Sequence, residues 1–134
     1  MITYLWIAMG GALGSMARYA TSNAVAGWLG GHFPWGTLII NILGSFVIGF
    51  FAALTGPGGR LHLLVSNDAR LFVMIGICGG YTTFSSFSLQ TLDLMHDGAW
   101  MRAGLNVVGS VALCLIAVFA GYLAATAINA AKTS

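Results

Sequence analysis

The sequence has very few charged side chains. Only 6% of its 134 residues are charged, and its three acidic residues are all aspartates. Soluble domains carry about 25% charged residues, and a soluble chain this short could not bury 58% hydrophobic residues in one core. The scarcity of charge therefore excludes an ordinary soluble protein and predicts a protein embedded in lipid. The mean hydropathy of +0.90 agrees.

Runs of basic residues are also missing. The five Lys and Arg side chains are scattered, and the formal net charge is only +2. A nucleic-acid-binding protein needs a basic patch or stripe, so the sequence predicts no nucleic-acid partner. The two cysteines, Cys78 and Cys114, lie in apolar stretches without the spacing of a metal site. We expect both to be reduced thiols in apolar surroundings.

No carboxylate stands inside an apolar stretch. Asp68, Asp93 and Asp97 all fall near predicted loops. Proton-coupled drug export needs a membrane-embedded carboxylate, which argues against a small multidrug transporter. The chain also lacks a nucleotide-binding motif and an acid–base pair, so the sequence predicts that it is not an enzyme. A subunit that only packs within a membrane assembly is the other alternative.

Four apolar stretches predict an all-α membrane protein with four transmembrane helices. They cover about 2–26, 35–54, 71–92 and 103–131 in a single domain, 1–134. About 20 helical residues cross a hydrocarbon core of ~30 Å. No Lys or Arg precedes the first stretch, and its apolar pattern continues beyond the length of a signal-peptide core. We therefore predict a first span rather than a removed segment.

The charge asymmetry across these spans is small. With both termini on one face of the membrane, that face holds Arg60, Arg70 and Lys132. The other face holds Arg102, together with Arg18 if it lies near the end of the first span. Lys132 is expected to extend from the last span to the interface. Three charges against one or two is a weak positive-inside bias, which permits insertion in both directions.

Glycines in the first span predict close helix packing. Gly10, Gly11 and Gly14 have the small-x-x-x-small spacing that lets helix backbones approach in lipid. Gly27 and the glycines that follow it predict the end of this helix, and Pro34 predicts the start of the next.

The middle of the third span is unusual for a lipid-embedded helix. Two adjacent glycines, Gly79 and Gly80, precede five hydroxyl residues within 82–88. Irregular backbone at this depth survives only inside protein or beside a polar cavity. The pattern predicts a helix broken at mid-membrane, whose free carbonyls can coordinate a hard cation such as Na⁺. The alternative is a close helix crossing at Gly76 and Gly80, with the hydroxyls bonded back to their own helix.

Two aromatic rings accompany these hydroxyls. Phe84 and Phe87 are three residues apart and share a helix face. Ring edges are positively polarised. Interleaved with the hydroxyls of Thr83, Ser85 and Ser88, they would form a donor-rich lining without cations, which suits a partly dehydrated anion. Simple packing of the two rings is the alternative.

Polar residues in the other spans extend this hypothesis. The amide of Asn41, near the middle of the second span, suits either an anion contact or an interhelical hydrogen bond. Asn106 and Ser110 lie four apart on one face of the fourth span and suit a polar track or a helix contact. Arg18 is the one charge well inside an apolar span. It would raise the anion concentration at a pore mouth, anchor to lipid phosphate or cap a neighbouring helix.

The sequence resembles the Fluc/CrcB family of fluoride channels over essentially its whole length. The resemblance rests on GGALGSMAR at 10–18, PWGTLIIN at 34–41, GS at 109–110 and above all GGYTTFSSFS at 79–88. It implies an antiparallel, dual-topology homodimer in a bacterial inner membrane. It also implies two fluoride pores and a central structural Na⁺ in each dimer, which would passively export fluoride and lower its cytoplasmic concentration.

The resemblance implies a role for each candidate residue. The backbone carbonyls of Gly79 and Thr82 would hold Na⁺, and the rings of Phe84 and Phe87 would line the pores. The other pore residues would be Asn41, Thr83, Ser85, Ser88, Asn106 and Ser110, with Arg18 as the basic residue of the first span.

Two residues depart from the family pattern. Gln90 stands where family members often carry Glu, so no acidic group can be required there. Tyr81 replaces a more usual Leu. We expect its hydroxyl to need a hydrogen-bonding partner, and the larger side chain to alter packing near the predicted Na⁺ site.

Overall fold

The computed structural model describes residues 1–131, and all regular structure in that range is helical, as predicted. Lys132 and its predicted place at the interface lie outside the described residues. The helices in chain order are α1 (Ile2–Leu29), α2 (Trp35–Thr55), α3 (Asn67–Leu71), the π-helix η1 (Phe72–Cys78), α4 (Gly79–Tyr81), α5 (Phe84–His96) and α6 (Trp100–Ala130).

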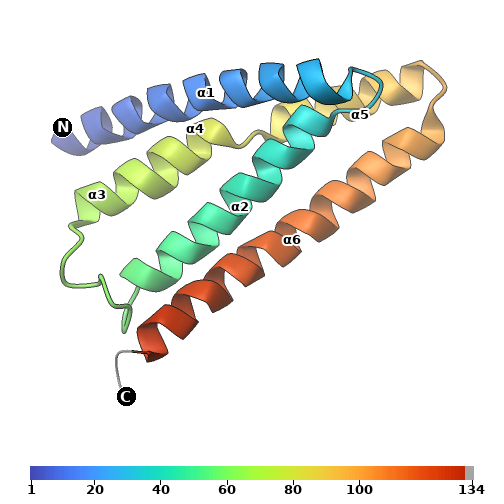
Figure 1. Cartoon of the computed structure of the whole chain (residues 1–134). Helices are drawn as coiled ribbons and strands as arrows, with labels where there is room; N and C mark the ends of the chain where they lie inside the picture. The colour runs from blue at the N-terminus through green and yellow to red at the C-terminus, as the bar shows by residue number, and fades with distance from the viewer. Residues whose placement is uncertain (132–134) are drawn as a thin grey trace.

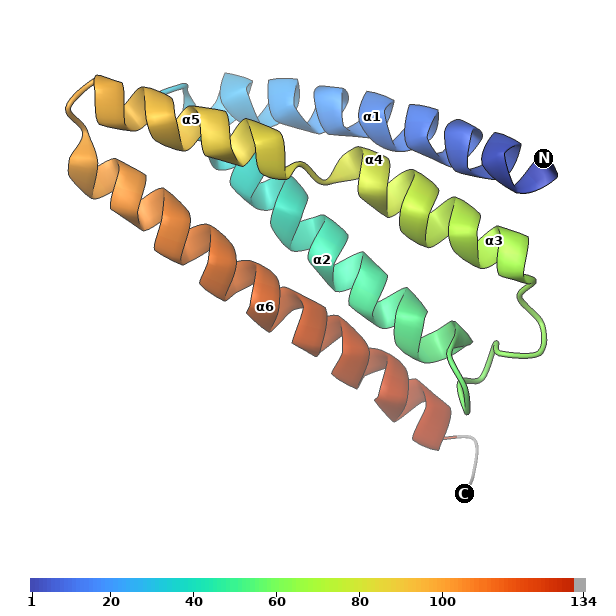
Figure 2. The same cartoon turned by 180° about the vertical axis from the view of Figure 1, so that it is seen from behind.

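The chain runs along the molecule four times (Figures 1 and 2). α1 and α2 form the first two passes, α3, η1, α4 and α5 follow one another in the third, and α6 forms the fourth. The N-terminus, the 56–66 connection and the end of α6 lie at one end of the molecule. The shorter connections, 30–34 and 97–99, lie at the other end (Figure 1). α2 packs along α6, and α1 packs along η1 and α4.

Backbone geometry decides where the first two helices end and begin. α1 continues through Gly27 and ends where Gly30 takes a φ of 75°, a region that is open to glycine. The predicted end at residue 26 was therefore too early. α2 begins directly after Pro34, as predicted. Proline is suited to a helix start because its missing N–H would have no helical acceptor there.

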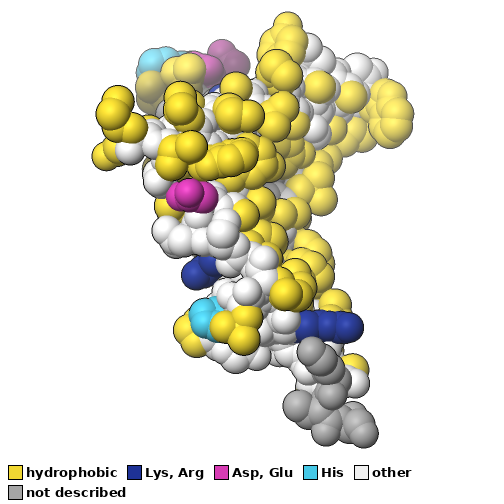
Figure 3. All heavy atoms as spheres, turned by 90° about the vertical axis from the view of Figure 1, so that its left-hand side faces the viewer, with side chains coloured by type: hydrophobic (Ala, Val, Ile, Leu, Met, Phe, Trp, Pro, Cys, Tyr) yellow, Lys and Arg dark blue, Asp and Glu magenta, His cyan; other side chains and the backbone are white. Residues whose placement is uncertain are grey.

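Apolar side chains are distributed in the reverse of a soluble protein. The buried apolar residues are few, and large side chains such as Tyr19, Val108 and Phe119 are exposed. Hydrophobic side chains cover most of the surface seen in Figure 3. Among the described residues, three helical segments are long and apolar enough to cross a membrane; they are 35–55, 67–96 and 100–130. α1 has the length, at 28 residues, but is less apolar.

Glycines bring α1 against the third pass at backbone distance. A Cβ atom added to Gly10 would lie 2.5 Å from the carbonyl oxygen of Phe72, and one added to Gly14 would overlap the carbonyl oxygen of Ile77. No side chain fits at either place. The close approach predicted for these two glycines is therefore confirmed, and it lets van der Waals packing hold the helices together in lipid.

The partner helix contributes its own glycines to this crossing. Gly76 lies against Gly10, and Gly80 lies against the backbone of Gly11. The crossing considered for Gly76 and Gly80 is thus present. Gly11 itself differs from the other two glycines of α1, because a Cβ atom added there would meet no described atom within 4 Å.

This difference allows a matched test of the helix crossing. We expect Gly14→Ala to lower the free energy of unfolding by about 1–3 kcal/mol, because the added methyl group forces the two backbones apart. Gly11→Ala is the control, and it should be neutral or stabilising by up to about 1 kcal/mol, since alanine favours a helix. Thermal unfolding of both purified variants in detergent measures the difference. Equal melting temperatures would contradict this account of the crossing.

Candidate ion site at the broken helix

The third pass is broken after the glycines rather than at them. Gly79 has helical angles, φ −66° and ψ −37°, and α4 continues through Tyr81. The Thr82 N–H still bonds to the Cys78 carbonyl at 2.9 Å, as in a regular helix. The prediction that the break extends from Gly79 to Thr82 was therefore wrong in position, because Gly80 serves the crossing with α1 and stays helical.

Two threonines form the break. Thr82 (φ −79°, ψ 158°) and Thr83 (φ −153°, ψ 116°) are both extended, a conformation that β-branched residues accept readily. Thr83 is also the N-cap of α5. Its Oγ1 accepts a hydrogen bond from the Ser86 N–H at 3.2 Å and lies 3.1 Å from the Ser86 hydroxyl. Threonine is a favoured N-cap, so the chain resumes its helix at once.

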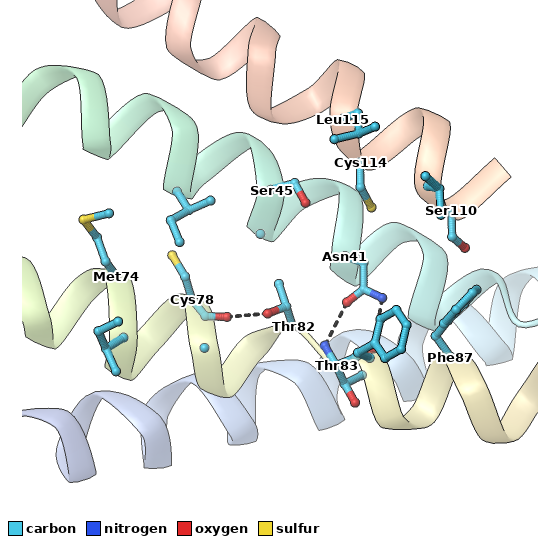
Figure 4. Close-up of a pocket in the computed structure, with 16 residues that line it drawn as sticks. Asn41, Ser45, Met74, Cys78, Thr82, Thr83, Phe87, Ser110, Cys114 and Leu115 are labelled. Carbon is cyan, nitrogen blue, oxygen red and sulfur yellow. Dashed lines mark hydrogen bonds between the residues drawn. The ribbon is translucent and has the colours of Figure 1, made fainter. Parts of the chain in front are cut away.

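Asn41 of α2 bonds to both backbone groups of Thr83, whose N–H has lost its helical acceptor at the break. Its Nδ2 donates to the Thr83 carbonyl at 3.1 Å, and its Oδ1 accepts from the Thr83 N–H at 2.8 Å (Figure 4). Unpaired backbone groups are costly at this depth. The interhelical hydrogen bond considered for Asn41 is thus present. These two bonds use one of the two amide hydrogens, so the second is not committed by them.

The bond from the Thr83 N–H to Asn41 also changes the hydrogen bonding of the Gly79 carbonyl. In an unbroken helix, the Thr83 N–H would bond to the Gly79 carbonyl, four residues back. Here that N–H is taken by Asn41 instead. The Gly79 carbonyl consequently loses its helical donor, while the Cys78 carbonyl accepts bonds from both the N–H and the hydroxyl of Thr82.

A groove of about 610 Å³ runs beside the break, between α2, η1, α4, α5 and α6. Figure 4 shows side chains from these helices converging on it. None of the residues that line it is charged. Seven of the predicted site residues are among them, namely Asn41, Gly79, Thr82, Thr83, Phe84, Phe87 and Ser110. The structure therefore brings these seven together from three of the four passes.

The two aromatic rings lie side by side on α5. The ring centres of Phe84 and Phe87 are 5.2 Å apart, and the planes are tilted by 50°. Phe87 is 8% exposed, whereas Phe84 is 77% exposed. Phe84 thus contacts the Phe87 ring but leaves most of its own ring open beside the groove.

The remaining predicted residues do not line the groove. Ser88 donates back to the Phe84 carbonyl at 2.9 Å, and the Ser85 hydroxyl lies 3.3 Å from that of Thr83. Asn106 is buried behind the groove. Arg18 is half-buried on α1, and within residues 1–131 it has no hydrogen bond or ion pair.

Sequence reasoning missed Thr91. This buried residue lies one helical turn beyond Phe87, and its hydroxyl donates to the Phe87 carbonyl at 2.7 Å. It also accepts a hydrogen bond from the Asn106 Nδ2 at 2.8 Å. The spacing of four from Phe87 was the available signal, but the contact with α6 was visible only in the fold.

The two departures from the family pattern have definite surroundings. The Tyr81 hydroxyl donates to the Thr21 hydroxyl of α1 at 3.2 Å, so the partner that it was expected to need is present. Gln90 lines a second pocket of about 390 Å³ at the end of the molecule, which also includes Asp93 and Arg102. Its Oε1 is buried and has no hydrogen-bond partner among the described residues.

The fold and the groove define the class of this protein. It is a small helical membrane protein in which a discontinuous helix lines an uncharged, largely apolar groove that also holds hydroxyl, amide and aromatic groups. The family model of the CrcB-like proteins, described as "Camphor Resistance (CrcB)", matches residues 5–122. The chain therefore belongs to the CrcB family, which is a family of ion channels and not of enzymes.

Its relatives match over almost their full lengths. A protein of Opitutus terrae is 60% identical over 134 residues, which is 100% of both chains. A protein of Methylocella silvestris is 58% identical over 96% of this chain and 97% of its own, and one of Paramagnetospirillum magneticum is 57% identical over 96% and 99%. Each of the three is named as a fluoride-specific ion channel, FluC.

Proposed function

We propose that this protein is a fluoride-specific channel, through which fluoride leaves the cytoplasm passively. The observation that carries the proposal is the neutral groove at the broken helix, where Phe84 and Phe87 lie among hydroxyls. Fluoride is small and strongly hydrated, so its path must replace water with many weak donors without trapping the ion. The lining has no charge that would trap the ion, and Asn41, Thr83 and Ser110 carry groups that can donate to it. The names of the relatives support the choice of ion.

Four membrane spans and a bacterial inner membrane belong to this proposal. α1 would be the fourth span, because it has the length to cross and presents exposed apolar side chains along its course. Like the other passes, α1 runs from one end of the molecule to the other (Figure 1). A channel that exports fluoride from the cytoplasm must lie in the membrane that bounds the cytoplasm, which is the inner membrane.

The functional unit in this proposal is an antiparallel homodimer with two pores. The groove is open on one side, so a single chain offers no complete wall around an ion. A second copy would close it. The weak charge asymmetry supports opposite orientations, since Arg60 and Arg70 lie at one end of the molecule and Arg102 at the other.

A central Na⁺ completes the proposal, with the Gly79 and Thr82 carbonyls of both copies as its ligands. These residues fit the ion, because Na⁺ is a hard cation that prefers oxygen ligands. The Gly79 carbonyl has lost its helical donor to Asn41, and both residues line the groove. Bound Na⁺ would hold two copies together and offset the negative end of each α4.

Fluoride efflux from liposomes tests the function. Purified protein should release fluoride faster than chloride, without a proton gradient, from vesicles loaded with either salt. A small multidrug transporter would instead move an organic cation in exchange for protons, and a non-conducting subunit would release nothing. Either result in monodisperse protein would refute the channel.

A high-resolution experimental map tests the assembly. We expect two copies in opposite orientations across the open groove, with a spherical density between their Gly79 and Thr82 carbonyls that is lost when Na⁺ is withheld. Parallel copies would refute the dual topology. A map in which the Gly79 carbonyl regains the Thr83 N–H would refute the Na⁺ site.

A further inference from the structure

A string of buried hydrogen bonds lies directly behind the groove, and it joins α5 to α6. Of the three side chains in the string, those of Ser110, Asn106 and Thr91, only Ser110 lines the groove. Its hydroxyl donates to the Asn106 Oδ1 at 3.4 Å, the Asn106 Nδ2 donates to Thr91 at 2.8 Å, and the Thr91 hydroxyl donates to the Phe87 carbonyl at 2.7 Å. Asn106 is 2% exposed, and Thr91 and Ser110 are 7% exposed.

Thr91 determines the direction of every bond in this string. A carbonyl oxygen can only accept, so the single hydroxyl hydrogen of Thr91 is committed to Phe87. The Thr91 oxygen can then only accept from Asn106. This forces Asn106 to turn its Nδ2 toward Thr91 and its Oδ1 toward Ser110.

The consequence reaches the groove at Ser110. Because Asn106 presents a carbonyl oxygen, Ser110 must give it the hydroxyl hydrogen and leaves its lone pairs for other neighbours. A fluoride ion can use Ser110 as a donor only by drawing that hydrogen away from Asn106. The 3.4 Å separation is long for a hydroxyl donor, so the hydrogen is held weakly and can be released.

We propose that Thr91 is a positioning residue that weakens anion binding at Ser110 by keeping its hydroxyl hydrogen turned away from the groove. The inference rests on the proposed conduction of fluoride. In conduction, Thr91 would prevent over-tight binding of fluoride at Ser110, since an ion held strongly at one site leaves slowly. Without the Thr91 hydroxyl, the Asn106 amide is free to turn over and donate to Ser110, which then points its hydrogen into the groove.

The test is the dependence of fluoride flux on fluoride concentration in liposomes that hold Thr91→Val. Valine keeps the shape of threonine and removes the hydroxyl. We expect half-saturation at a fluoride concentration about two- to tenfold lower than in the wild type, as expected for one gained hydrogen bond. The maximal flux should fall, because release slows. Thr91→Ser should behave like the wild type, because it restores the hydroxyl.

Two controls separate positioning from a general effect of the mutation. Thr126 also bonds its hydroxyl back to its own helix, at 2.8 Å to Leu123, but lies away from the groove, so Thr126→Val should change neither quantity. The double variant Thr91→Val, Ser110→Ala should have the same half-saturation as Ser110→Ala alone, since the effect of Thr91 acts through the serine hydroxyl.

Several results would overturn the inference. An unchanged half-saturation in folded Thr91→Val would do so, and so would a shift that persists without the Ser110 hydroxyl. If Thr91→Val does not fold, Thr91→Cys replaces it, because a thiol donates weakly; the shift should then be smaller but in the same direction, and no shift would refute the inference. A wild-type protein that passes no fluoride would instead refute the proposed channel itself.

Discussion

Exchanging Phe87 for Ile is expected to lower fluoride flux by about tenfold or more while the protein stays folded, and Phe84→Ile should do the same. Both rings line the groove, and most of the Phe84 ring is exposed although it contacts Phe87. A ring edge carries partial positive charge, whereas an aliphatic side chain has none. Losing one contact to a charged ion removes about 1.5–3 kcal/mol, which corresponds to roughly tenfold or more in occupancy.

The measurement is fluoride efflux from liposomes that hold monodisperse protein. Phe119→Ile is the matched control, because Phe119 lies on α6, is 61% exposed and does not line the groove. It should conduct normally. If the two rings only packed against each other, their exchange would lower stability and spare transport. Normal flux in both Phe84 and Phe87 variants would show that the pore lies elsewhere.

Replacing Asn41 by Asp is expected to lower fluoride flux by at least about tenfold, through two effects of one substitution. An ionised carboxylate places negative charge beside the anion path; at 4 Å and an effective dielectric constant near 20 this repulsion is about 4 kcal/mol. It can also no longer donate to the Thr83 carbonyl, although it can still accept from the Thr83 N–H. Thr83 then loses one of its two hydrogen bonds to α2.

Protonation distinguishes this mechanism from simple misfolding. A neutral carboxyl group carries one O–H, which can again donate to the Thr83 carbonyl. The flux of Asn41→Asp should therefore rise toward that of the wild type as the pH falls through the pKa of the introduced group. A flux that stays low at every pH in folded protein would contradict the charge mechanism.

Asn129 supplies the control for this substitution. It too uses its amide to satisfy backbone groups: its Oδ1 accepts from the Arg60 N–H at 2.9 Å, and its Nδ2 donates to the Ala53 carbonyl at 3.2 Å. Asn129→Asp should lower stability by about 1 kcal/mol, because the partly buried Ala53 carbonyl loses its donor. Since Asn129 does not line the groove, flux per folded protein should be unchanged. Equal loss of flux in both variants would assign the Asn41 effect to stability alone.

The third pass shows how far a pattern of residues predicts a structure. Five hydroxyls after a glycine pair were enough to predict irregular backbone, and the extended Thr82 and Thr83 confirm that such a break exists. Its position was predicted wrongly because glycine has two uses in a membrane helix. It weakens the helix, and it also permits close approach. Gly80 serves the second use, which depends on α1 lying against it.

The sequence by itself determined that the protein lies in lipid, that it is helical, and that its glycine spacing lets helices approach closely, because each of these follows from composition and local spacing. Only the tertiary structure decided where the third helix breaks and which donors face the groove. Asn41 and Thr83 are 42 residues apart, and Asn106 and Thr91 are 15 apart. The physical reason is that a hydrogen bond has one direction and one partner for each hydrogen, and across helices the packing selects that partner.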